Sequence, residues 1–127
     1  MDIRRQIEYW INTATDDLQS AELLIENKKI LQGLFFCHLC IEKAIKAHIV
    51  SFTTEIPPKS HNLLFLIGKT NLEISDDDKD FCGILMSYQL EGRYPEYYPE
   101  SPSKITAFEY LSRTKTFQSW LKAKLSK

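Results

Sequence analysis

The chain has 127 residues, a formal net charge of −1 and three cysteines. This length fits one domain with a core of its own, which needs neither a disulfide nor a structural metal. The near-neutral charge excludes a global positive field that would drive non-specific binding to nucleic acid. Only 4 glycines and 5 prolines are present, which favours helices over a turn-rich β fold. We therefore expect a single domain over residues 1–127.

Nothing in the pattern points to a membrane or to export. The longest apolar stretches fall far short of the roughly 18 residues that suggest a membrane span. Met1 leads directly into polar, helix-forming residues, with no apolar signal-peptide segment after it. Cys37, Cys40 and Cys82 are an odd number for a disulfide framework, which favours reduced thiols. The sequence therefore predicts a cytoplasmic protein that does not enter a membrane.

Two long helices are predicted in the first half of the chain. Apolar residues recur every three or four positions along residues 3–25, which is the spacing of one helical face. Asn27 is expected to end this helix, because asparagine tolerates the left-handed conformation found at helix C-termini. The second helix, over residues 30–52, is apolar on most sides, so we expect it at the centre of the fold. Pro57 and Pro58 prevent any continuation.

Two further helices are predicted in the middle of the chain. A short one is expected to follow Ser60 and to end near Gly68. The next begins at Ser75, whose side chain can cap it, and ends at Gly92. Three aspartates follow Ser75 in the first turn, where the helix dipole favours negative charge.

The last predicted helix follows a segment, residues 93–102, that holds three prolines and cannot be regular helix. Ser101 is expected to cap it, with Pro102 at its first position. Its buried side is expected to comprise Ile105, Phe108, Leu111, Phe117, Leu121 and Leu125. Its C-terminal end carries Lys122, Lys124 and Lys127, where the helix dipole favours cations. Together these elements predict an all-α, up-and-down helical bundle of four long helices plus one short helix.

Cys37 and Cys40 form a Cys-x-x-Cys pair, a spacing that can serve redox chemistry or zinc binding. The pair falls in the middle of an apolar helix, whereas the redox motif needs a helix N-terminus. A structural zinc site needs four ligands, and the other candidates (His48, His61 and Cys82) are scattered. Buried thiols that pack as small hydrophobic groups are the simpler interpretation. We expect no metal and no cofactor.

The strongest candidate site is the segment that follows the fourth helix. Arg93 stands at the helix end, where it can present a planar guanidinium group to a phosphate or a carboxylate. Tyr94, Tyr97 and Tyr98 can stack on a base or fill a protein interface. The alternative is a packed loop in which the arginine pairs with an acidic residue of the bundle.

Glu42 and Lys46 are additional candidates for ligand binding. They are four residues apart on the most apolar helix and can pair on one face. A charge on a buried helix must be paired, or must face a cleft or another subunit. An exposed ion pair and a functional polar position both fit this pattern. Glu42 and Glu91 are also the acidic residues that could pair with Arg93.

Four segments in order resemble the HEPN domain family. They are Trp10 with ATDDLQSA at residues 14–21, FCHLCIEKAIKA at residues 36–47, SHNL at residues 60–63 and GRYP at residues 92–95. The resemblance covers about residues 5–125, nearly the whole chain. It implies a helical bundle that dimerises and that works beside a minimal nucleotidyltransferase protein. It also implies a role in toxin–antitoxin or other defence and stress systems.

Many members of this family are metal-independent ribonucleases that use an Arg-x4–6-His motif. Here all three histidines precede Arg93, and the histidine position of the Arg-x4-His spacing holds Tyr98. Tyrosine, with an ordinary pKa of about 10, cannot readily replace histidine as an acid–base group near neutral pH. The sequence therefore favours a binding role, with no catalytic residue assigned. We expect a homodimeric accessory subunit that binds a nucleotide or RNA; the alternatives are a ribonuclease toxin with a degenerate site and a purely structural dimer.

Overall fold

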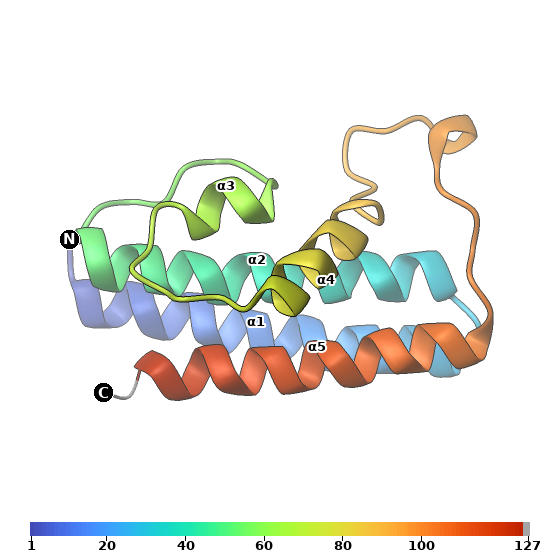
Figure 1. Cartoon of the computed structure of the whole chain (residues 1–127), viewed down its shortest axis with the longest axis horizontal. Coiled ribbons are helices and arrows are strands. Elements are labelled where there is room, and N and C mark those ends of the chain that lie inside the picture. Colours follow the sequence, from blue (N-terminus) through green and yellow to red (C-terminus); the bar gives the residue numbers. More distant parts are fainter. Residues whose placement is uncertain (126–127) are drawn as a thin grey trace.

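The computed structural model describes residues 1–125, which form helices and contain no strand. The α-helices are α1 (Ile3–Glu26), α2 (Ile30–Thr53), α3 (Leu63–Ile67), α4 (Asp76–Met86) and α5 (Lys104–Leu125). Figure 1 shows α1, α2 and α5 side by side, with α2 and α5 running opposite to α1. The shorter α3 and α4 lie against α2. The predicted all-α bundle of four long helices and one short helix is confirmed.

α2 is the central helix, as its composition predicts. It packs against every other α-helix of the bundle. Its closest neighbour is α1, and Gly33 makes this approach possible. A Cβ atom at Gly33 would lie only 2.5 Å from Cγ1 of Ile25 and 3.1 Å from the carbonyl oxygen of Ala21. Contacts this short do not occur between real atoms, so the two helices pack over a position without a side chain.

The ends of α1 and α2 differ in detail from the prediction. α1 stops before Asn27 as expected, but Asn27 has a φ of −95° and its side-chain Nδ2 donates to the carbonyl of Leu23. The left-handed residue is Lys28, with a φ of 64°. α2 ends at Thr53, and Thr54 takes the left-handed conformation. Asn27 was therefore the wrong choice for the left-handed position, because its side chain already binds the end of the helix.

α4 begins as predicted and ends early. The backbone N–H of Asp78 donates to Oγ of Ser75 at 3.1 Å, which confirms the cap. The helix stops at Met86 rather than at Gly92. The chain continues in tight turns, in which the N–H groups of Ser87 and Tyr88 bond to carbonyls three residues earlier. Gly92 follows with a φ of 79°, which redirects the chain away from the helix.

α5 begins later than predicted. Oγ of Ser103, rather than Ser101, accepts from the N–H of Thr106 at 3.1 Å, so Pro102 precedes the helix. The buried face runs through Ala107, Leu111, Thr114, Phe117, Gln118 and Leu121. Ile105 lies off this face and is 76% exposed, so its predicted burial is wrong. Lys122 and Lys124 lie in the last turn as expected, and Lys127 lies outside the described residues.

The three cysteines are buried and unpaired by disulfides. Burial raises the pKa of Cys37 to about 11 and that of Cys82 to about 12. A thiol with so high a pKa is almost fully protonated at neutral pH and packs as an apolar group. Along residues 1–125, no helix has the length and apolarity that a membrane crossing requires.

Candidate functional site

Glu42 is the centre of a buried ionic cluster on α2. Its Oε2 atom accepts from Nζ of Lys46 at 3.0 Å, and its Oε1 atom accepts from Nδ1 of His61 at 2.8 Å. Glu42 and Lys46 are 3% and 6% exposed. The pair predicted from the spacing is therefore present, but it is buried rather than exposed. Glu42 also ties α2 to the segment that precedes α3.

His38 supports the same segment from inside the core. Its Nε2 atom donates to the carbonyl of His61 at 3.0 Å, and its Nδ1 atom lies 3.8 Å from Oε1 of Glu42. Burial lowers the pKa of His38, so the imidazole is neutral near pH 7. The backbone and the side chain of His61 are thus both held by residues of α2. This double attachment fixes the direction in which the His61 ring points.

A surface pocket of about 370 Å³ lies beside this cluster. It is lined by His61, Asn62, Met86, Ser87, Gln89, Glu91 and Arg93. Nε2 of His61 lies 3.4 Å from Oε2 of Glu91, so the ring has a carboxylate at each nitrogen. The fold therefore brings together a histidine and an arginine that are far apart in the sequence.

Arg93 is held at the rim of this pocket by backbone oxygens. Its Nη1 atom donates to the carbonyl of Ser87 at 3.0 Å and to that of Gln89 at 3.2 Å. Within residues 1–125, no carboxylate lies within ion-pair distance of its guanidinium group. The packed-loop alternative, with Arg93 paired to Glu42 or Glu91, is therefore not formed. Nε and Nη2 have no acceptor among the same residues and remain able to donate to a ligand.

The three tyrosines do not gather around Arg93. Tyr98 lines a separate depression of about 460 Å³, together with Gln32, Phe35, Leu39, Leu90 and Glu91. Tyr94 precedes a short 3-10 helix, η1 (Pro95–Tyr97), and Tyr97 is its last residue; they are 71% and 67% exposed. Their rings face solvent and line none of the pockets described here. Only Tyr94, which directly follows Arg93, is adjacent to the arginine in the chain.

His61 is the site residue that the sequence analysis did not propose. It belongs to the SHNL segment that carries the family resemblance, but its place beside Arg93 depends on how the segment before α3 packs on α2. The one available signal was chemical: a histidine beside Asn62, the residue that caps α3. The spacing of Arg93 relative to later residues could not reveal it.

Comparison with known proteins agrees with the fold and the four segments. The family model described as HEPN domain matches residues 7–124, so the chain belongs to the HEPN domain family. The crystal structure of TT1696 from Thermus thermophilus superposes with a TM-score of 0.79 and 18% identity. The match covers 94% of this chain and 98% of that chain, and at this identity it supports the fold alone. A search of the curated proteins found no match.

Proposed function

We propose that this chain is a single-domain, dimeric binding module that takes a phosphate-bearing ligand, such as a nucleotide, at the Arg93 pocket. The observation that carries the proposal is the fixed guanidinium group at the pocket rim. Its Nη1 atom donates to the carbonyls of Ser87 and Gln89, while the N–H groups of Nε and Nη2 remain free to donate to a ligand. A pre-oriented arginine with two free donors suits the oxygens of a phosphate or a carboxylate.

The exposed Tyr94 and Tyr97 extend the proposed site beyond the phosphate. Both rings are exposed, and Tyr94 directly follows Arg93 in the chain, so that a base attached to the phosphate can stack there. The accessory role beside a minimal nucleotidyltransferase, in a toxin–antitoxin or stress system, rests on membership of the HEPN family. In that role the same surface contacts the partner protein.

The test of this proposal is an equilibrium titration of the purified protein with a nucleoside triphosphate. Arg93→Ala removes charge-assisted hydrogen bonds worth about 1.5–3 kcal/mol, so we expect more than a tenfold loss of affinity. Arg5→Ala is the control, because Arg5 is an exposed arginine on α1. Equal affinities of the wild type and Arg93→Ala would contradict the proposal.

A second candidate function is supported by one specific observation. Glu42 orients His61, and His61 lines the same pocket as Arg93. A carboxylate, a histidine and an arginine are the parts that a metal-independent ribonuclease needs. Against this function, Nε2 of His61, the nitrogen that Glu42 does not bind, already lies 3.4 Å from Oε2 of Glu91, and no histidine follows Arg93 in the chain. We therefore favour binding over cleavage.

A further inference from the structure

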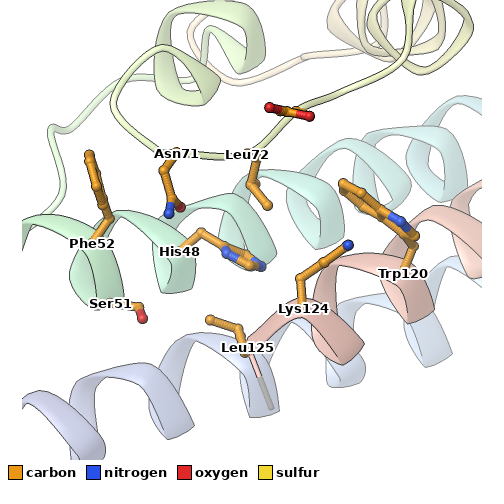
Figure 2. Close-up of a pocket in the computed structure, with 9 residues that line it drawn as sticks. His48, Ser51, Phe52, Asn71, Leu72, Trp120, Lys124 and Leu125 are labelled. Atoms are coloured by element: carbon orange, nitrogen blue, oxygen red, sulfur yellow. The ribbon is translucent and has the colours of Figure 1, made fainter. Parts of the chain in front are cut away.

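A second pocket, of about 500 Å³, lies between α2, α5 and the segment that joins α3 to α4. Figure 2 shows His48 from α2 and Trp120, Lys124 and Leu125 from α5 pointing into the space, with Asn71 above them. Its volume lies within the range of about 300–1,000 Å³ that is usual for small-molecule sites. It shares no residue with the Arg93 pocket.

His48 gives this pocket a polar atom that lacks a partner. The side chain is 5% exposed, and its Nε2 atom donates to the carbonyl of Leu121 at 2.7 Å. Because a carbonyl only accepts, Nε2 must carry the proton. Burial lowers the pKa of His48, so Nδ1 is a lone-pair acceptor near neutral pH. No residue in the described part of the chain donates to this atom, which a ligand with an N–H or O–H group can satisfy.

The rest of the lining indicates what such a ligand would carry. Lys124 and Glu73 supply one charge of each sign, and neither forms an ion pair within residues 1–125. This balance suits a zwitterion better than a polyanion such as a nucleotide. Phe52 supplies aromatic surface against which a flat ring can pack, and the Trp120 ring carries Nζ of Lys124 at 5.4 Å from its centroid.

We propose that this pocket binds a free amino acid whose aromatic side chain donates a hydrogen bond to Nδ1 of His48. The carboxylate of the ligand pairs with Lys124, and its ammonium group pairs with Glu73. The site is independent of the proposed function, because a nucleotide at Arg93 touches none of these residues.

The test uses L-tryptophan as the probe and NMR of the ¹⁵N-labelled protein as the readout. We expect saturable shifts of the indole N–H of Trp120 at ligand concentrations up to about 10 mM. The matched ligand is 3-benzothienyl-L-alanine, in which sulfur replaces the indole N–H. We expect it to bind at least about fivefold more weakly, because it cannot donate to Nδ1 of His48. Absence of saturable shifts with L-tryptophan would overturn the proposal.

Variants separate direct contact from a structural effect. His48→Phe keeps an aromatic ring but has no acceptor, so it should bind the two ligands equally, with its fold checked by the spectrum without ligand. Lys124→Gln and Glu73→Gln should each weaken the binding of L-tryptophan about two- to fivefold, as expected for the loss of an exposed ion pair. Lys122→Gln, on the same helix but outside the pocket, should bind as the wild type does. The proposal is wrong if His48→Phe still prefers L-tryptophan, or if Lys124→Gln and Lys122→Gln behave alike.

Discussion

At the level of single residues, Glu42 is a buried carboxylate that contacts two other polar side chains. It compensates the buried ammonium group of Lys46 and also orients the ring of His61. Removing one partner of a buried ion pair leaves the other charge without compensation. We expect Glu42→Gln to lower the free energy of unfolding by about 3 kcal/mol in urea denaturation.

Two comparisons control the Glu42 experiment. Glu8→Gln breaks an exposed pair between Glu8 and Arg4 and should leave stability almost unchanged. The double variant Glu42→Gln with Lys46→Met removes the uncompensated charge and should recover part of the loss. A stability of Glu42→Gln equal to that of the wild type would show that the ion pair does not hold the fold.

The two buried histidines predict how stability depends on pH. Burial lowers the pKa of His38 and of His48 below the ordinary value of 6.5. The unfolded chain therefore binds more protons than the folded one just below pH 6.5, and stability falls as the pH falls. Burial raises the pKa of Asp17 above 3.8, although the neighbouring Lys43 opposes this shift. Asp17 therefore stabilises the folded chain as the pH falls, the opposite of the histidines, and does so at a lower pH.

His48→Gln isolates one of these contributions. Each fully shifted histidine changes the free energy of unfolding by up to about 1.4 kcal/mol per pH unit. Urea denaturation at about pH 7.5 and about pH 5.5 should show a smaller drop for His48→Gln than for the wild type. An identical drop in both proteins would mean that His48 does not resist protonation.

At the scale of helices, the contact between α1 and α2 depends on the missing side chain of Gly33. Gly33→Ala would place a Cβ atom 2.5 Å from Ile25, so the helices must separate. We expect a loss of about 1–3 kcal/mol, although alanine is the better helix former. Gly83→Ala, within α4 with nothing inside 4 Å, should instead gain about 0.5–1 kcal/mol. Thermal unfolding that ranks the two variants in the reverse order would contradict this packing.

Helix positions followed from periodicity more reliably than helix ends did. The apolar stripes place α1 and α2 within one or two residues, because burial of a face dominates over many turns. The ends of helices depend on single hydrogen bonds, and the hydroxyl groups of Ser101 and Ser103 could each cap α5, so the sequence alone does not choose between them. Only the fold decides that Ser103 caps α5 and that Ile105 lies outside the bundle.

At the scale of the whole molecule, we predict a two-fold dimer, as membership of the HEPN family suggests. Several large apolar side chains are exposed, among them Ile56, Leu64 and Phe65. Burial of such surface favours association. Sedimentation at micromolar concentration should give twice the chain mass of 14.8 kDa. A monomer under these conditions would remove the dimer from the proposed function.

The candidate site was predictable only in part. Arg93 and the pair of Glu42 with Lys46 could be predicted from residue chemistry and spacing. In the structure, Arg93 lines one pocket, and the Glu42–Lys46 pair lies beside that pocket. The presence of His61 there was not predictable, since it requires the packing of the segment before α3 on α2. The separation of Tyr98 from Arg93 likewise depends on the turn at Gly92, which periodicity does not describe.

In the proposed function, the Arg93 pocket binds its ligand without cleaving it. Incubation of a labelled RNA with wild type, Arg93→Ala and His61→Asn tests it most directly, because loss of a general base typically costs on the order of a hundred- to ten-thousand-fold in rate. We predict that all three proteins leave the RNA intact, since no histidine follows Arg93 and Nε2 of His61 lies 3.4 Å from a carboxylate oxygen of Glu91. Robust cutting by the wild type that disappears in both variants would contradict the account and establish a ribonuclease that uses His61.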